Sequence, residues 1–209
     1  MYIQLYVDAI LAAFCNVKGY NCFAQTNSGQ IILNSGGNMK TVARFEKVSY
    51  EQFRKDLLSY NLYEEDKIKE IYNNIKLPER ATKDSAGYDF FVPVDIKLMP
   101  ESMTGLPVPT GIRCKMDEDV VLMLYPRSGL GFKYGMALLN TVGVIDSDYY
   151  NADNEGHIKL KISNPSNKTL ELKAGSAIMQ GIFTPYYLAE ESTPTAERTG
   201  GFGSTDTTR

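Results

Sequence analysis

The 209-residue chain has few of the residues that metal chemistry needs. It contains three cysteines, Cys15, Cys22 and Cys114, and a single histidine, His157. The odd number of cysteines and their spacing fit no zinc-binding pattern, so a reduced cytosol is the simplest setting. One histidine cannot build a histidine-rich metal site, and we expect it to lie in a loop.

Long apolar runs and an excess of one charge are also missing. No apolar run reaches the ~18–20 residues that span a bilayer, and the apolar N-terminal stretch lacks the basic start of a secretory signal. Lysine and arginine total 22 against 25 acidic residues, a net charge of −3. This balance gives no electrostatic footprint for nucleic acid or an anionic membrane. We expect a cytoplasmic protein that binds neither.

The texture of the sequence divides the chain into four segments. Residues 1–38 mix a short apolar stretch with a polar, glycine-rich one. From about residue 86, β-rich runs recur at a spacing of roughly 8–12 residues, which is typical of a sandwich, jelly roll or barrel. The end of the chain is polar and glycine-rich, as in solvated tails. The predicted segments are an extension over 1–38, a strand and helical hairpin over 39–76, a β core over 77–188 and a C-terminal arm over 189–209.

Residues 39–76 carry the pattern of a short strand and two helices. Ser49 followed by Gln52 is typical of a capping box at a helix start. The acidic residues over 64–66 suit the first turn of a second helix, and Pro78 prevents its continuation. The apolar face of that second helix would be formed by Ile68, Ile71, Tyr72 and Ile75.

Four later stretches carry residue types suited to anion binding or catalysis. "PRSGLGF" (126–132) joins an arginine and a hydroxyl to glycines that let backbone N–H groups approach an anion. "NTVGVIDSDY" (140–149) ends an apolar run in two acids, which alone indicates a hairpin end. "SAIMQGIF" (176–183) places Gln180 in an apolar strand, where a structural hydrogen bond would explain it. "ERTGGFGST" would suit a phosphate-and-base clamp if it were ordered.

Together with "SAGYDFF" (85–91), these stretches resemble the five motifs of the homotrimeric dUTP pyrophosphatase (dUTPase) family, in order and with similar spacing. The resemblance covers about residues 77–206. It implies an all-β jelly-roll (β-clip) core, here with a small N-terminal helical hairpin extension, and a homotrimer whose active sites are shared between subunits. The implied reaction hydrolyses dUTP to dUMP and pyrophosphate with Mg²⁺, and it requires positioning, charge stabilisation and an oriented nucleophile.

The resemblance also implies roles for single residues. Asp146 matches the general base that activates water, Tyr149 matches the ring under the deoxyribose, and Asp89 matches the acid near magnesium, held through water. The uracil-reading hairpin is matched by Asn140, Gly143, Val144 and Ile145. The phosphate-facing positions are matched by Arg127, Ser128, Gly129 and Gln180. The remaining predicted substrate-binding residues are Lys159 and, in the arm, Arg198, Phe202, Gly203 and Ser204.

The chain departs from the family's pattern in three places within the resemblance. Ala177 stands where many members have a basic residue. The fifth motif is one residue shorter between Arg198 and the glycines. Residues 150–156 insert a loop after the catalytic hairpin, which would contact a neighbouring subunit or have no role.

Two other functions remain open at the level of sequence. A dCTP deaminase-type relative has the same fold, although the "DSDY" arm and the "GGFGST" tail argue against it. A nucleotide-sensing regulatory protein would bind a protein partner through the N-terminal extension. Ammonia release from dCTP, and partner capture with and without residues 1–76, would separate these functions.

Residues 1–38 are expected to lie outside the working protein, with Met39 as the natural start. They differ in composition from the rest of the chain and offer no motif, and "GGNM" (36–39) can be encoded by codons that contain a purine-rich ribosome-binding sequence. Gly-Gly-Asn is also a common turn. Removing these residues should leave activity and oligomeric state unchanged.

Overall fold

The computed structural model describes residues 22–27, 30–35, 40–60, 64–190 and 200, with the backbone alone described over 22–27 and 30–35. The chain forms two compact units, Met1–Thr41 and Val42–Arg209. In the first unit, β1 (Cys22–Asn27) and β2 (Gln30–Ser35) pair as an antiparallel hairpin, with Cys22 opposite Ser35. The sequence patterns did not indicate this hairpin. Met39 lies outside the described residues.

The second unit begins with the strand and two helices that the sequence predicts. These are β3 (Ala43–Lys47), α2 (Tyr50–Ser59) and α3 (Glu65–Asn73). Ser49 caps α2 by accepting a hydrogen bond from the Gln52 backbone N–H at 3.1 Å. Only this half of the capping box forms, because the Gln52 side chain donates instead to Asp56 Oδ2 at 2.7 Å. The Ser49 backbone N–H donates to Glu155 Oε2 at 2.7 Å.

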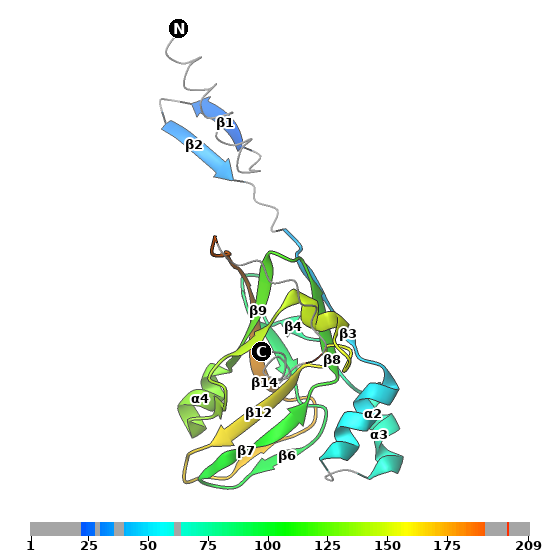
Figure 1. The fold of residues 1–209 in the computed structure, drawn as a ribbon. Coiled ribbons are helices and arrows are strands. Elements are labelled where there is room, and N and C mark those ends of the chain that lie inside the picture. The colour runs from blue at the N-terminus through cyan, green and yellow to red at the C-terminus, as the bar shows by residue number, and fades with distance from the viewer. Residues whose placement is uncertain (1–21, 28–29, 36–39, 61–63, 191–199, 201–209) are drawn as a thin grey trace. The chain divides into compact units, whose positions relative to one another are not determined.

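The remainder of the second unit is built from short antiparallel strands (Figure 1). A five-stranded sheet has the order β11-β9-β14-β5-β4, and a three-stranded sheet has the order β10-β12-β7. Two-stranded pairs join β13 to β6 and β3 to β8. The bounds of these elements are β4 (Glu79–Arg80), β5 (Tyr88–Phe91), β6 (Ile96–Leu98), β7 (Ser102–Pro109), β8 (Ile112–Met116), β9 (Val120–Pro126), α4 (Ser128–Tyr134), β10 (Ala137–Leu138), β11 (Gly143–Ile145), the 3-10 helix η1 (Ser147–Asn151), β12 (Lys159–Asn164), β13 (Leu170–Leu172) and β14 (Ala177–Pro185).

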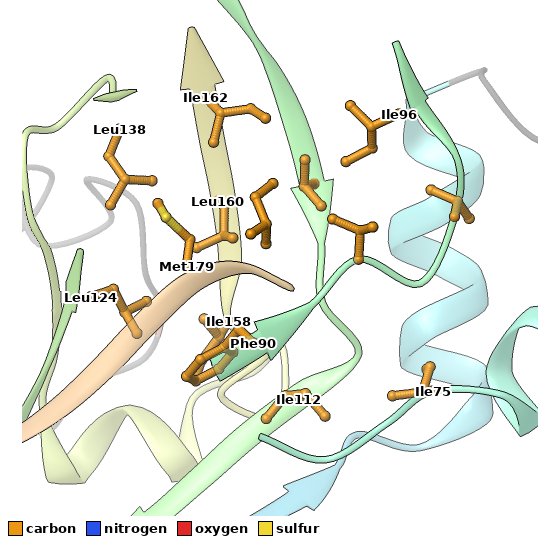
Figure 2. Packing of buried hydrophobic residues seen from close by; sticks show 14 of the residues in the cluster. Ile75, Phe90, Ile96, Ile112, Leu124, Leu138, Ile158, Leu160, Ile162 and Met179 are labelled. Carbon is orange, nitrogen blue, oxygen red and sulfur yellow. The ribbon is translucent and has the colours of Figure 1, made fainter. Parts of the chain in front are cut away.

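One hydrophobic core joins the helices to the sheets. Phe53 and Leu57 of α2 and Ile68 of α3 are fully buried and belong to the same cluster as Phe90 and Met179 of the β strands. Figure 2 shows side chains from β5, β9, β12 and β14 converging on this core. Each fully buried side chain of this size contributes about 1.5–3 kcal/mol relative to exposure. The helical segment is therefore packed as part of the second unit.

Candidate functional site

A pocket of about 470 Å³ opens beside the short strand β11. Six of the predicted substrate-binding residues line it together, and they come from β11, from the loop before it, from η1 and from the start of β12. The remaining wall is mostly leucine. The predicted residues in the lining are Asn140, Gly143, Val144, Ile145, Tyr149 and Lys159.

The path of β11 explains how this wall forms. Gly143 pairs with Leu124 of β9, and a Cβ at position 143 would lie 3.0 Å from the Leu124 Cβ. A contact that close favours glycine, so β11 can run tightly against β9. The turn before β11 is also tight, since the Val142 N–H donates to the Asn140 carbonyl at 2.7 Å and Thr141 has φ 66°. Val144 is left 53% exposed at the pocket.

Tyr149 is fixed behind the pocket by the inserted loop. The ring is 4% exposed. Its hydroxyl donates to the His157 carbonyl at 2.9 Å and accepts from Asn154 Nδ2 at 2.7 Å. Gly156 has φ +68°, and a Cβ there would lie 2.6 Å from the Tyr149 carbonyl oxygen. Residues 150–156 thus fold back on Tyr149 within the same chain.

The same loop joins the pocket wall to the N-terminal part of the second unit. Tyr150 donates its hydroxyl hydrogen bond to Glu46 Oε2 at 2.7 Å, and the Ser49 hydroxyl donates to Glu155 Oε1 at 2.6 Å. Lys159 Nζ donates to Asp56 Oδ1 at 3.0 Å. Sequence reasoning missed Asp56 and the burial of His157, although His157 does lie in the predicted loop. The sequence did offer one indication of Asp56, because this acidic residue lies on the apolar face of a helix with Phe53 and Leu57.

A second group of predicted residues meets on the five-stranded sheet. Gln180 of β14 lies opposite Asp89 of β5 and Tyr125 of β9. Arg127, just beyond β9, forms an ion pair with Asp89 at 3.2 Å between Nε and Oδ1. The amide of Gln180 donates to the Pro126 carbonyl at 3.4 Å. A Cβ on Gly87 would lie 2.8 Å from Gln180 Oε1, so this glycine leaves room for the amide.

Helix α4 continues this second group into solvent. Ser128 and Gly129, both predicted to face phosphates, are exposed in its first turn. A Cβ added at Gly129 or at Gly131 would meet nothing within 4 Å, so packing within this chain does not require either glycine. Phe132 on the same helix is 96% exposed. This face is bare in the single chain.

Asp146 does not line the 470 Å³ pocket. It precedes η1 with an extended backbone, at φ −79° and ψ 158°. Its half-buried side chain borders another hollow, of about 600 Å³, together with Ser147 and Asp148. The single chain therefore does not gather all predicted residues in one cavity. Arg198, Phe202, Gly203 and Ser204 lie outside the described residues.

The donor groups present suit a metal ion that arrives with a substrate. Over the described part of the chain, no group of three or more histidine, cysteine or acidic residues could hold a metal ion by itself. Asp89 offers one carboxylate beside Arg127. Magnesium commonly binds one or two carboxylates, substrate phosphates and retained waters, so this donor set fits that mode. Among the described helices, none is long and apolar enough to cross a membrane.

The fold corresponds to that of a known class of enzyme. The dUTPase family model matches residues 73–206. The chain is 41% identical over 141 residues to a deoxyuridine 5′-triphosphate nucleotidohydrolase of Lactococcus lactis subsp. lactis. The aligned region covers 63% of this chain and 88% of that protein. It therefore belongs to the dUTPase family, which confirms the predicted fold class and the predicted enzyme class.

Solved structures agree with this assignment. A dUTPase from Streptococcus mutans aligns with a TM-score of 0.52 at 35% identity, covering 70% of this chain and 98% of that chain. A mutant dUTPase from phage phi11 of S. aureus, described with a structural Mg(II) ion, aligns with a TM-score of 0.52 at 18% identity, covering 75% of this chain and 98% of its own. The second likeness concerns the fold alone.

Proposed function

We propose that the protein hydrolyses dUTP to dUMP and pyrophosphate and that the pocket beside β11 holds the deoxyuridine. The observation that carries this proposal is the gathering of six predicted substrate-binding residues, five of them from one motif, around one pocket of about 470 Å³. Asn140 and the backbone of Gly143–Ile145 would read the uracil edge. A narrow wall of this kind rejects the thymine methyl group sterically and cannot satisfy the exocyclic amine of cytosine.

Tyr149 would test the sugar. Its ring is held by two hydrogen bonds to its hydroxyl and is almost fully buried. A ring fixed in this way cannot move aside for a 2′-hydroxyl, so UTP would clash where dUTP fits. Selectivity would then come from a penalty on the competitor rather than from an added contact to the substrate.

The triphosphate would extend toward Arg127, Ser128, Gly129 and Gln180. Arginine and backbone N–H groups are suited to phosphate oxygens. Asp89 would face magnesium through water, and the bound ion would supply charge neutralisation on the phosphates. Asp146 would accept a proton from the attacking water as the general base. The arm residues Arg198, Phe202, Gly203 and Ser204 would close over the nucleotide and exclude water.

A homotrimer with shared sites would bring the separated regions together. In one chain, Asp146 borders a different hollow from the nucleoside pocket, and α4 leaves Phe132 almost fully exposed beside two glycines that face open space. Both observations support completion of each site by neighbouring subunits. We place the protein in the cytoplasm, and a protein partner bound through the N-terminal extension stays a prediction.

The test measures pyrophosphate release from dUTP, dTTP, dCTP and UTP, with ammonia release from dCTP measured in parallel. The expected result is rapid release from dUTP, much slower release from the other three and no ammonia. Hydrolysis of all four at similar rates would contradict the assignment of the pocket. Ammonia from dCTP would indicate the deaminase reaction instead.

A further inference from the structure

A buried polar cluster lies directly behind the proposed nucleoside pocket. Asp56 of α2 is 7% exposed and His157 is fully buried. Asp56 Oδ2 lies 2.5 Å from His157 Nδ1 and accepts from Gln52 Nε2 at 2.7 Å. Asp56 Oδ1 accepts from Lys159 Nζ at 3.0 Å. The proposed chemistry uses neither Asp56 nor His157.

Hydrogen bonding fixes the proton arrangement of this cluster. The Gly111 backbone N–H donates to His157 Nε2 at 2.8 Å, so Nε2 carries no proton. The proton of the neutral ring is then on Nδ1, which donates to Asp56. Burial lowers the pKa of His157 by more than the neighbouring Asp56 raises it, which keeps the ring neutral. The Asp56 carboxylate is balanced by the Lys159 ammonium.

Two branches lead from Asp56 to the pocket. Lys159 forms an ion pair with Asp56 and also lines the pocket. His157 Nδ1 donates its hydrogen bond to Asp56, and the His157 carbonyl accepts from the Tyr149 hydroxyl at 2.9 Å. Each branch ends on a residue of the pocket wall.

Helix α2 holds Asp56 firmly against this wall. Phe53 and Leu57, the neighbours of Gln52 and Asp56 on the same helix face, are fully buried in the core. The start of α2 is tied by Ser49 to Glu155 in the loop that folds over Tyr149. The helix precedes residue 73, where the match to the family model begins, so the cluster links a helix outside that match to the pocket.

We propose that Asp56 is a positioning residue of the nucleotide site, acting through His157 and Lys159 on the ring of Tyr149 and the pocket wall. Helix α2 is then part of the apparatus that selects dUTP over UTP. The proposal rests on the proposed role of the pocket as the deoxyuridine site.

The test compares Asp56→Asn with Ile68→Val in the full chain, with kcat and KM measured for dUTP and UTP. Asparagine replaces one carboxylate oxygen with an NH2 group, which cannot accept a hydrogen bond from His157 or Lys159, and it removes the negative charge that pairs with the Lys159 ammonium. Misplacement of a positioning group costs up to about 100-fold, so we expect kcat/KM for dUTP to fall on the order of tenfold, mostly through KM, and the dUTP/UTP preference to fall as well. Ile68→Val loosens the buried face of α3 without touching the cluster and should leave both quantities unchanged.

A double-mutant cycle separates positioning from general loosening. Tyr149→Phe removes the hydroxyl that bonds the His157 carbonyl and keeps the ring. If Asp56 acts along that branch, Asp56→Asn should change the dUTP/UTP preference less in the Tyr149→Phe background than in the wild type. Equal effects in the two backgrounds would overturn the Tyr149 branch, and a preference unchanged by Asp56→Asn would overturn the whole proposal.

Two further results keep the outcomes distinct. If Asp56→Asn does not fold, Gln52→Met removes one of the three side-chain donors to the same carboxylate. It should shift the preference in the same direction by about twofold or more, as a lost hydrogen bond does, and no shift would overturn the proposal. If Tyr149→Ala also fails to alter the dUTP/UTP preference, the proposed function of the pocket fails, rather than the positioning role alone.

Discussion

Two parts of the proposed site are built in contrasting ways. We call the pocket wall around Tyr149 the nucleoside wall, and the group formed by Asp89, Arg127, Gln180 and helix α4 the phosphate side. Behind the wall, Tyr149, His157 and Asp56 are buried and joined by hydrogen bonds of 2.5–2.9 Å. On the phosphate side, Arg127 is 44% exposed, its ion pair with Asp89 spans 3.2 Å, and the glycines of α4 face open space. Under the proposed function, a single chain would pre-organise base and sugar recognition, whereas phosphate binding and chemistry would need other parts of the chain or other subunits.

The largest expected effect of a substitution is a loss of catalytic rate with nucleotide binding retained. Asp146→Asn keeps the shape of the side chain but cannot accept a proton from water. General-base loss typically costs ~10²–10⁴-fold in rate, and we expect a kcat loss in that range with dUTP binding largely intact. Steady-state turnover and binding of a non-hydrolysable analogue measure the two quantities. Turnover near the wild-type rate would show that Asp146 is not the base.

Deletion of the C-terminal arm tests whether the arm completes the phosphate side of the site. Deleting residues 196–209 should reduce turnover on the order of 100-fold, because an open site admits water and leaves the phosphates poorly placed. The segment contains only one large apolar residue, Phe202, so the melting temperature should not change. Activity assays, thermal melts and sedimentation measure the outcome. Retained activity, or loss of the trimer, would contradict this role.

Truncating the wall should affect selectivity more than rate. Tyr149→Ala removes the ring that would clash with a 2′-hydroxyl, so the preference for dUTP over UTP should fall by about tenfold or more. Binding of dUTP should weaken less than the preference does. Parallel kcat/KM measurements with the two nucleotides decide the matter, and equal losses for both would refute a role in sugar selection.

Parts of both regions could be predicted from the sequence because their patterns are local. The capping serine at 49, the two helices and the apolar β11 stretch are apparent from spacing alone. The family resemblance assigned Gln180 to phosphate and Asp89 to magnesium, and only the strand register shows that the two residues lie opposite each other. Strand β7 could not be predicted, since Gly105, Pro107 and Pro109 interrupt it. The Asp56–His157 bond joins residues 101 positions apart, and no spacing rule reaches that far.

The smallest expected effect is a pH dependence of stability that arises from the buried histidine behind the nucleoside wall. His157 is the only histidine in the chain, and burial lowers its pKa below the usual value of 6.5 in the folded protein. As the pH falls below 6.5, the unfolded chain takes up a proton that the folded chain does not bind, so the free energy of unfolding decreases, by at most about 1.4 kcal/mol per pH unit.

Burial alone would raise the pKa of Asp56, but hydrogen bonds from His157, Gln52 and Lys159 outweigh burial and lower it. Stabilisation by Asp56 is therefore lost only in stronger acid, well below this window. Urea unfolding at pH 7.5, 6.5 and 5.5 should show a decline in the wild type and a flatter profile in His157→Gln, even though the variant is less stable throughout. The same decline in both proteins would show that the buried ring is not its source.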